Sequence, residues 1–235
     1  MNAGDSIKVK NADWKFGGET VKSFEEHIKR SVPYYQDGHK LVKNLSDFFV
    51  KEDSIVYEIG SSTGKLIYEL SKRHEHRKNA LFYGIELEKD MYEFAKNRYE
   101  NPNLKFICED VNLYDFEKSD LFVSYYTVQF IHPKQRQTLI NKIYESLEWG
   151  GAFLMFEKVR ANDARFQDII TTLYMEYKLQ NGYTPEEIVA KQRSLKGVLE
   201  PFSSEANKDM LKRAGFEDIL TVFKYLNFEG ILAIK

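Results

Sequence analysis

A short loop rich in glycine and serine follows the first strongly apolar strand-like run of the chain. Residues 58–64 read EIGSSTG, and a helical pattern begins directly after them. Glycine at Gly60 and Gly64 lets the backbone turn sharply and lets a ligand lie against bare peptide, because a Cβ would obstruct both. The carboxylate of Glu58 ends the strand and could face an amino group of that ligand. The loop therefore favours an adenosyl amino acid as the bound molecule.

Two more acidic residues stand at the ends of the next strand-like runs. Glu86 closes the run 80–86, about 25 residues after the loop, and Asp110 follows the run 104–108. In open α/β sheets, ligands bind along the edge where the carboxyl ends of parallel strands meet. We expect Glu86 to accept hydrogen bonds from ribose hydroxyls and Asp110 to accept one from an adenine amino group.

The same loop allows two other interpretations. A dinucleotide site needs the pattern GxGxxG, and the residue two after Gly60 is Ser62, which argues against it. The loop also fits GxSxG, the nucleophile turn of α/β hydrolases, with Ser62 as nucleophile. Such an enzyme needs a late histidine, whereas His132 follows the fourth strand-like run. Loss of essentially all activity in Ser62→Ala would indicate a hydrolase. A third possibility is a fold that binds the cofactor without turnover.

Strand-like and helical patterns alternate from about residue 54 onward, which predicts a parallel sheet covered by helices on both faces. Expected strands span 54–59, 80–86, 104–108, 121–126 and 152–158, with helices at 65–73, 91–99 and 134–147, and residues 149–151 (WGG) as a turn. A helix at 205–214 and two strands at 219–225 and 230–234 form a different ending, an antiparallel hairpin. The fold class is α/β, a doubly wound seven-stranded sheet of order 3-2-1-4-5-7-6, similar to that of class I methyltransferases.

Two largely helical segments lie outside this pattern. Residues 1–50 form an expected N-terminal helical cap, and residues 163–200 form an insertion interrupted at 181–185 (NGYTP). Insertions of this kind form lids or dimer contacts. We treat 1–235 as one domain.

Composition narrows the classes of function. The chain has 235 residues, 43% of them hydrophobic, with a formal charge of −2 and one cysteine. The sequence contains no long apolar run of the kind that predicts a membrane span or a secretory signal, so we expect a cytoplasmic protein. One cysteine excludes an internal disulfide and a cysteine-based zinc site, and we expect no metal. The charge indicates a small-molecule substrate rather than strong direct binding of nucleic acid.

Several motifs along nearly the whole chain resemble one family, the carboxy-S-adenosyl-L-methionine synthases. They are residues 13–16 (DWKF), 30–33 (RSVP), 56–62 (VYEIGSS), 127–130 (TVQF), 142–144 (KIY), 150–151 (GG) with 157–158 (EK), 181–183 (NGY) and 227–228 (NF). The segments RSVP and TVQF are more specific than the glycine loop.

The resemblance implies a reaction in which carboxylate is removed from prephenate and placed on the methyl group of S-adenosylmethionine, and it implies a homodimer formed through the insertion. It also implies positions that contact the cofactor or its carboxylated derivative. With the loop residues above, the candidate cofactor-binding residues are Tyr35, Glu58, Gly60, Ser61, Ser62, Gly64, Glu86, Leu87, Asp110, Val111, Tyr125 and Gln192.

Two positions depart from the family pattern. The asparagine at the end of the fourth strand is Tyr125 here, and the arginine that grips the product carboxylate aligns with Gln192. A neutral amide cannot replace the paired charge of a guanidinium, and the adjacent Arg193 is turned by about 100° on a helix. We therefore expect methyl transfer from S-adenosylmethionine to a small acceptor, with carboxylation of the cofactor as the alternative. The candidate catalytic residues are Tyr35, Tyr125, His132 and Arg193.

Overall fold

A computed structural model of the chain describes residues 1–5, 7–18 and 20–235. Its strands form one seven-stranded sheet in the order β3-β2-β1-β4-β5-β7-β6, which confirms the expected order. The strands are β1 (Ile55–Ile59), β2 (Leu81–Glu86), β3 (Leu104–Cys108), β4 (Ser119–Tyr125), β5 (Leu147–Lys158), β6 (Asp218–Tyr225) and β7 (Phe228–Ile234). The first five are parallel neighbours, and β7 runs antiparallel between β5 and β6.

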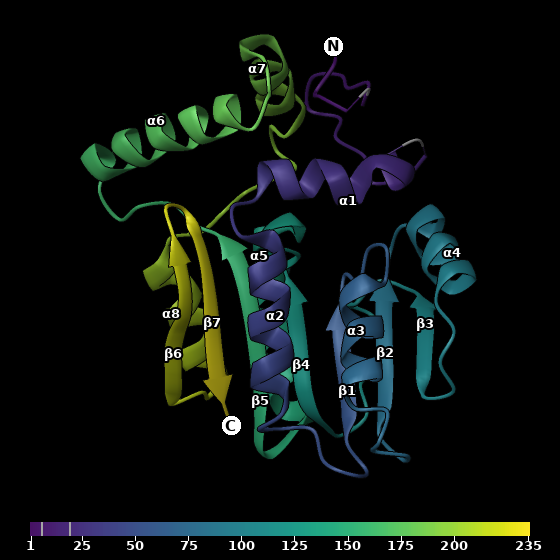
Figure 1. Cartoon of the computed structure of the whole chain (residues 1–235). Coiled ribbons are helices and arrows are strands. Elements are labelled where there is room, and N and C mark those ends of the chain that lie inside the picture. Colours follow the sequence, from purple (N-terminus) through teal and green to yellow (C-terminus); the bar gives the residue numbers. More distant parts are fainter. Residues whose placement is uncertain (6, 19) are drawn as a thin grey trace.

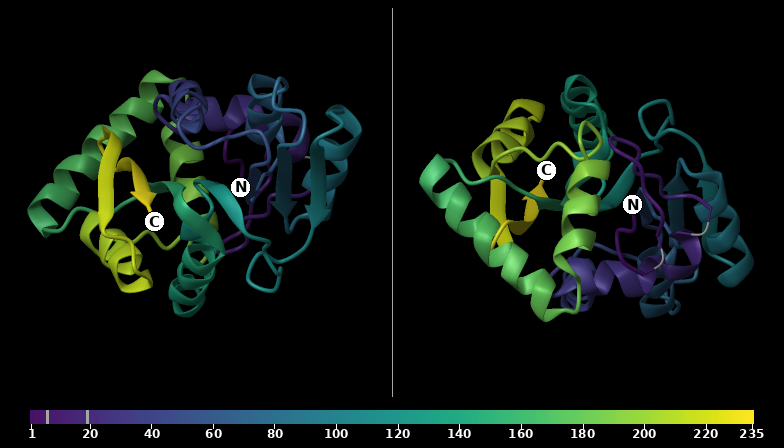
Figure 2. Two further views of the ribbon diagram at one scale, coloured as in Figure 1. Left: turned by 90° about the horizontal axis from the view of Figure 1, so that it is seen from below. Right: turned by 90° about the horizontal axis from the view of Figure 1, so that it is seen from above.

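Helices cover both faces of the sheet (Figures 1 and 2). On one face lie α2 (Tyr35–Ser46), α3 (Lys65–Arg73) and α4 (Lys89–Arg98), and on the other lie α5 (Pro133–Ser146) and α8 (Ser204–Ala214). Because side chains alternate along a strand, successive residues enter different cores. Val56 packs with Leu66 of α3 in one core, whereas Tyr57 packs with Leu139 of α5 in the other.

The remaining helices lie across the end of the sheet where the parallel strands finish (Figure 1). They are α1 (Thr20–Ser31), α6 (Ala164–Gln180) and α7 (Pro185–Ser194). The N-terminal segment joins them, because the backbone N–H groups of Ala12 and Trp14 donate to the carbonyl oxygens of Arg193 and Ser194. The short 3-10 helix η1 (Val128–Phe130) follows β4 below this layer. The expected cap includes Ser6 and Glu19, which lie outside the described residues.

The interruption predicted at 181–185 separates α6 from α7. Gly182 takes a φ of 82°, which suits a residue without a Cβ. The hydroxyl of Thr184 then accepts from the N–H of Glu187, and the Glu187 carboxylate accepts from the N–H of Thr184, so a capping box begins α7. Pro185 occupies the first turn, where its missing N–H costs no hydrogen bond. These four residues set the angle between the two helices above the site.

One predicted turn is wrong. Residues 149–151 lie inside β5, which begins at Leu147, before the expected start at 152. The pairing of β4 with β5 is irregular between Ser119 and Leu121, and Gly150 has a φ of 79°. The glycine therefore marks a bulge within a continuing strand, which a sequence pattern does not distinguish from a turn. Among the helices of the described residues, none combines the length and apolar character needed to cross a membrane.

Candidate active site

The loop after β1 is held against the end of β2. The backbone N–H groups of Gly60 and Ser61 both donate to the carbonyl oxygen of Ile85, at 2.8 and 3.0 Å. Gly60 has a φ of 66°, and a Cβ on it would come within 2.4 Å of the Thr127 side chain. The loop thus needs glycine at this position both for its conformation and for its packing.

Glu86 connects this loop to the start of α4. One carboxylate oxygen accepts from the N–H of Ser62 at 2.7 Å, and the other accepts from the N–H of Glu88 at 2.9 Å. Each oxygen keeps a second lone pair, and the side chain lines the large cavity. Burial raises the pKa of Glu86, and the nearby Glu88 charge adds to this, although hydrogen bonds from backbone N–H groups oppose the shift. Glu86 is therefore a fixed acceptor pair that fits two adjacent ribose hydroxyls.

Glu58 lies at the end of β1 beneath the first turn of α3. Its Oε2 accepts from the backbone N–H of Ile67 at 2.9 Å, so it satisfies one of the free donors at the start of that helix. The side chain is buried and lines the cavity, and burial raises its pKa well above the usual range. Within the described residues, no hydrogen bond reaches the other oxygen, Oε1, so it has the capacity to accept one from an amino group.

A third carboxylate lies after β3. Asp110 Oδ1 accepts from the backbone N–H and the side-chain amide of Asn112, at 2.9 and 2.8 Å. Beside it the cavity is lined by the apolar side chains of Val111 and Leu87, and Leu87 is 64% exposed. A flat apolar ring with an amino edge, such as adenine, fits between these groups. Ser61 Oγ, which has no hydrogen-bond partner in the described residues, is a further buried group available to a ligand.

Aromatic rings form the wall of the cavity next to β4. Tyr125 ends that strand and Tyr126 follows it, and their rings lie 5.1 and 6.4 Å from the ring of Tyr35 on α2. The Tyr125 hydroxyl donates to the carbonyl oxygen of Tyr35 at 2.6 Å, in a space that exists because residue 38 is glycine. Burial raises the pKa of Tyr125 well above its usual range. These tyrosines supply electron-rich faces for a cation such as a sulfonium, and they do not supply a base.

The other candidates from the sequence have different positions. Gly64 lies outside the cavity lining, and a Cβ there would collide with Phe106 and Ala95, so this glycine serves packing against β3 and α4. His132 lines the cavity and caps α5, where its Nδ1 accepts from the N–H of Lys134 at 3.3 Å. Gln192 and Arg193 are both exposed, and of the two only Gln192 lines the cavity.

Three lysines in the cavity were missed by the sequence analysis. Lys158 ends β5, Lys178 is on α6 and Lys191 is on α7. The ammonium groups of Lys158 and Lys178 both lie 4.6 Å from the centre of the Tyr174 ring. Only Lys158 had a signal in the sequence, because it stands at the carboxyl end of a predicted strand. The other two reach the site through the packing of the insertion.

Burial makes these lysines unusual. It lowers the pKa of Lys158 and of Lys178 to about 8, and the neighbouring Lys178 and Arg160 add to the effect on Lys158. Burial, then Lys178 and Lys158, lower the pKa of Lys191 to about 7. Within the described residues, no ion pair or hydrogen bond joins the Nζ of Lys158 or Lys178 to an acceptor. A cluster of partly desolvated lysines of this kind attracts an anion, because a negative charge nearby stabilises the protonated amines.

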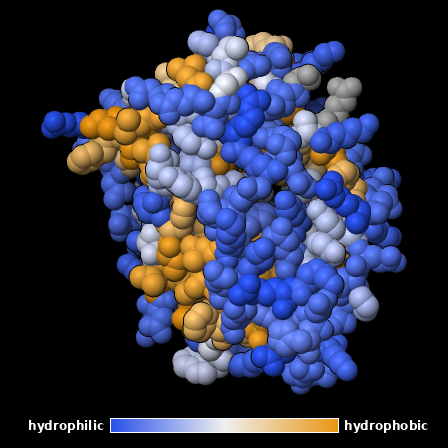
Figure 3. All heavy atoms as spheres, viewed as in Figure 1, coloured by the Kyte–Doolittle hydropathy of each residue, from blue (hydrophilic) through white to orange (hydrophobic). Residues whose placement is uncertain are grey.

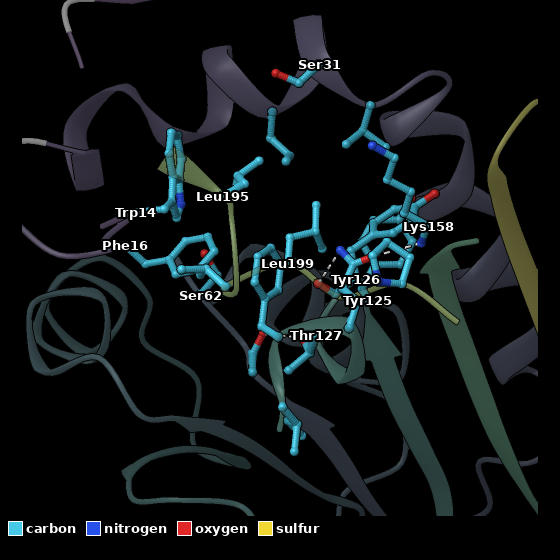
Figure 4. Close-up of a pocket in the computed structure, with 18 of the residues that line it drawn as sticks. Trp14, Phe16, Ser31, Ser62, Tyr125, Tyr126, Thr127, Lys158, Leu195 and Leu199 are labelled. Carbon is cyan, nitrogen blue, oxygen red and sulfur yellow. Dashed lines mark hydrogen bonds between the residues drawn. The ribbon is translucent and has the colours of Figure 1, made fainter. Parts of the chain in front are cut away.

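The cavity that contains all these groups has a volume of about 920 Å³. That is near the upper end of the range for small-molecule sites, about 300–1,000 Å³, so a cofactor and a second small molecule can share it. Figure 4 shows Ser62 and Thr127 near the strand ends, with Trp14, Phe16 and Ser31 above them and Lys158 to one side. Leu195 and Leu199, on the segment after α7, line the cavity between the strand ends and the residues above them.

A buried arginine fixes that closing segment. Arg136 on α5 is 1% exposed, and its guanidinium donates to the carbonyl oxygens of Ile131, Gln129 and Glu200 at 2.8–3.0 Å. It also lies over the ring of Phe202, 4.4 Å from the ring centre. One side chain thus ties the loop after β4 to the segment that closes the cavity.

Comparison with known proteins agrees with this geometry. Residues 56–151 match the family model described as a methyltransferase domain. The carboxy-S-adenosyl-L-methionine synthase of Staphylococcus epidermidis is 41% identical over 223 residues, which cover 94% of this chain and 97% of that protein. The enzyme of the same name from Nautilia profundicola is 37% identical, with 94% of each chain covered.

Solved structures with lower identity share the fold. A SAM-dependent methyltransferase of Thermotoga maritima has a TM-score of 0.60 at 19% identity and covers 92% of this chain and 96% of its own. Human N-acetylserotonin methyltransferase, solved with SAM, has a TM-score of 0.56 at 15% identity, with 94% and 63% covered. With the cradle at the strand ends, these findings lead to one conclusion: the chain belongs to the carboxy-S-adenosyl-L-methionine synthase family and is an enzyme that uses S-adenosylmethionine.

Proposed function

We propose that this protein transfers a carboxyl group from prephenate to the methyl carbon of S-adenosylmethionine. The observation that carries the proposal is that Lys158, Lys178 and Lys191 line the same cavity as the adenosyl cradle. The sequence analysis expected methyl transfer because Gln192 offered no cation for a carboxylate. The lysines provide that cation from other positions, so the departure at Gln192 is compatible with an anionic second substrate.

Different residues of the cavity bind the two substrates. When bound, S-adenosylmethionine supplies the methyl carbon that receives the carboxyl group. Glu86 and Asp110 hold its sugar and base, and the tyrosine wall accommodates its positive sulfur. The lysines hold the two carboxylates of prephenate and turn one of them toward that carbon, which makes the transfer an effectively intramolecular step. Overall, prephenate loses CO₂ and its ring hydroxyl and becomes aromatic, while the cofactor gains CO₂ and loses a proton that leaves as water with the hydroxyl.

Methyl transfer to a small acceptor is the second candidate. It uses the same cradle and is compatible with the match to the methyltransferase-domain model. It is favoured by the neutral side chain of Gln192 at the cavity, which Arg193 does not line. The two reactions leave different products. Methyl transfer converts the cofactor to S-adenosylhomocysteine, whereas carboxylation increases its mass by that of CO₂.

Mass spectrometry of the cofactor after incubation distinguishes these candidates. We expect protein, S-adenosylmethionine and prephenate together to give a cofactor heavier by CO₂, and phenylpyruvate in equal amount. Omission of prephenate should abolish the product. A reaction mixture that yields S-adenosylhomocysteine with a methylated acceptor, and no heavier cofactor, would contradict the proposal and support methyl transfer.

We also propose that the protein works as a homodimer in which α6 contacts a second copy. Phe166, Ile169 and Leu173 are 61%, 48% and 43% exposed, and their spacing places them on one side of the helix. In Figure 3 hydrophobic side chains gather over one end of α6 and over the β6–β7 hairpin, where Leu220 is 62% exposed. Exposed apolar patches of this kind are typical of protein interfaces.

Substitution on this face should separate the copies. We expect Leu173→Glu to sediment as a monomer at concentrations where the unmodified protein is a dimer, because an interface cannot bury an unpaired carboxylate cheaply. Thr172→Glu is the matched control, since Thr172 is exposed one position away and points in another direction. Equal sedimentation of Leu173→Glu and the control would rule out α6 as the contact.

A further inference from the structure

Lys191 is held by a chain of hydrogen bonds that begins at the N-terminal segment. Its Nζ lies 2.6 Å from His27 Nε2 and 2.9 Å from Ser31 Oγ, both on α1. On the other side of the imidazole, His27 Nδ1 lies 2.8 Å from Asp5 Oδ2. The Arg30 guanidinium fixes the Asp5 carboxylate through its second oxygen, at 2.5 Å. A carboxylate, an imidazole and an amine thus lie in series, and the amine is at the cavity.

The partners define the direction of each hydrogen bond. An ionised Asp5 only accepts, so His27 Nδ1 carries the hydrogen and Nε2 is the acceptor for Lys191. Ser31 Oγ donates to the carbonyl oxygen of His27 at 2.8 Å, and its lone pairs face Lys191 and the Tyr183 hydroxyl, which lies 2.8 Å away. Two positions of the amine are therefore occupied. The third is available to the cavity, as an N–H when Lys191 is charged and as a lone pair when it is neutral.

The charged and titratable groups around Lys191 come from every element packed against it. Arg30 and His27 are on α1, Asp5 is in the N-terminal segment, Lys178 is on α6 and Lys158 is on β5. Tyr183, just before α7, is a further titratable group, and its hydroxyl lies 3.2 Å from His27 Nδ1. His27 is 1% exposed, and burial, then Lys191, lower its pKa to about 3, so it stays neutral. Trp14 contributes a ring face 5.3 Å from Lys191 Nζ and no charge.

We propose that Asp5 and His27 are positioning residues that hold Lys191 as the titrating cation of the carboxylate subsite, so that the carboxylate substrate binds together with a proton. This inference rests on the proposed function, because its ligand is the carboxylate donor. The pKa of Lys191 is about 7 in the empty cavity, and an adjacent anion raises it. Below pH 7 the amine already carries its proton, and binding takes up none. Above pH 7 the amine takes up a proton from the solvent when the anion binds, and this group makes the affinity fall by up to about tenfold per pH unit.

Calorimetric titration measures this coupling without turnover. Prephenate is titrated at pH 7.5 into protein saturated with S-adenosylhomocysteine, in two buffers of different ionisation enthalpy, and the difference in heat gives the protons taken up. We expect a clear uptake by the unmodified protein. Lys191→Met should take up fewer protons and bind more weakly. Lys191→Arg should bind with an affinity that falls less between about pH 7 and pH 8 than that of the unmodified protein, because guanidinium does not titrate there and only Lys158 and Lys178 still lose protons.

The positioning role has its own variants. His27→Leu removes the acceptor for Lys191 and should weaken prephenate binding, whereas His27→Gln restores an acceptor oxygen and should recover part of it. An unchanged affinity for S-adenosylhomocysteine identifies the variants that remain folded. Full affinity and full proton uptake in a folded His27→Leu would overturn the role of His27, and uptake in Lys191→Met equal to that of the unmodified protein would overturn the role of Lys191.

These outcomes separate the inference from the proposed function. Proton uptake that depends on Lys191, without any heavier cofactor in the mass spectrum, would support the inference and refute carboxyl transfer. A heavier cofactor with uptake that does not depend on Lys191 would refute the inference alone. Absence of prephenate binding would refute both.

Discussion

Glu86→Ala is expected to weaken binding of S-adenosylhomocysteine by about 100-fold or more. Hydrogen bonds to a charged acceptor contribute about 1.5–3 kcal/mol each, and this carboxylate is placed to accept from two ribose hydroxyls. The substitution also leaves the N–H groups of Ser62 and Glu88 without their acceptor, which loosens the loop. Calorimetry gives the affinity, and thermal unfolding shows how much of the change is structural.

Two controls make this result specific. Glu86→Asp keeps a carboxylate at the end of β2 and should retain most of the affinity. Glu93→Ala removes an exposed carboxylate of α4 and should bind normally. If Glu86→Ala bound the nucleoside as tightly as Glu93→Ala, the ribose would lie elsewhere.

Lys178→Met is expected to raise the KM for prephenate by about 10- to 100-fold, because it removes one charged donor to a carboxylate. Binding of S-adenosylmethionine should be unchanged or tighter, because the substitution removes an ammonium group that repels the positive sulfur. Steady-state kinetics with each substrate varied in turn measures both effects. A higher KM for prephenate without weaker binding of S-adenosylmethionine is the signature of an anion subsite beside a cation.

The matched variants for this experiment are Lys178→Arg and Lys40→Met. The first keeps a positive charge and should recover much of the affinity for prephenate, and the second removes an exposed lysine of α2 and should have no effect. A KM for prephenate that is equal in Lys178→Met and Lys40→Met would contradict the role of the lysine cluster.

The sequence predicted the sheet and the cradle because both depend on local patterns. Glu58, Glu86 and Asp110 each end a strand, and parallel strands bring their carboxyl ends to one edge, so their gathering follows from topology alone. The local pattern did not reveal the role of Gly64. This residue has the left-handed conformation that the turn requires, but it packs against Phe106 and Ala95. The local pattern also failed at residues 149–151, where a bulge looks like a turn.

The second half of the site could not be predicted, because it depends on how distant segments pack. Lys178 and Lys191 belong to an insertion whose position over the sheet is set by the capping box at Thr184 and by contacts with the N-terminal segment. The link from His27 to Lys191 joins residues 164 apart. The sequence analysis considered Gln192 and Arg193 as the residues that bind the carboxylate. The cation that lines the cavity on this helix is Lys191, one position before Gln192.

The most direct test of the central claim is a crystal structure of the protein with S-adenosylhomocysteine and prephenate. The account predicts ribose hydroxyls at Glu86, the adenine between Leu87 and Asp110, and prephenate carboxylates within hydrogen-bonding distance of Lys158, Lys178 or Lys191. Density for the nucleoside away from the loop 60–62, or a prephenate whose carboxylates avoid all three lysines, would contradict it.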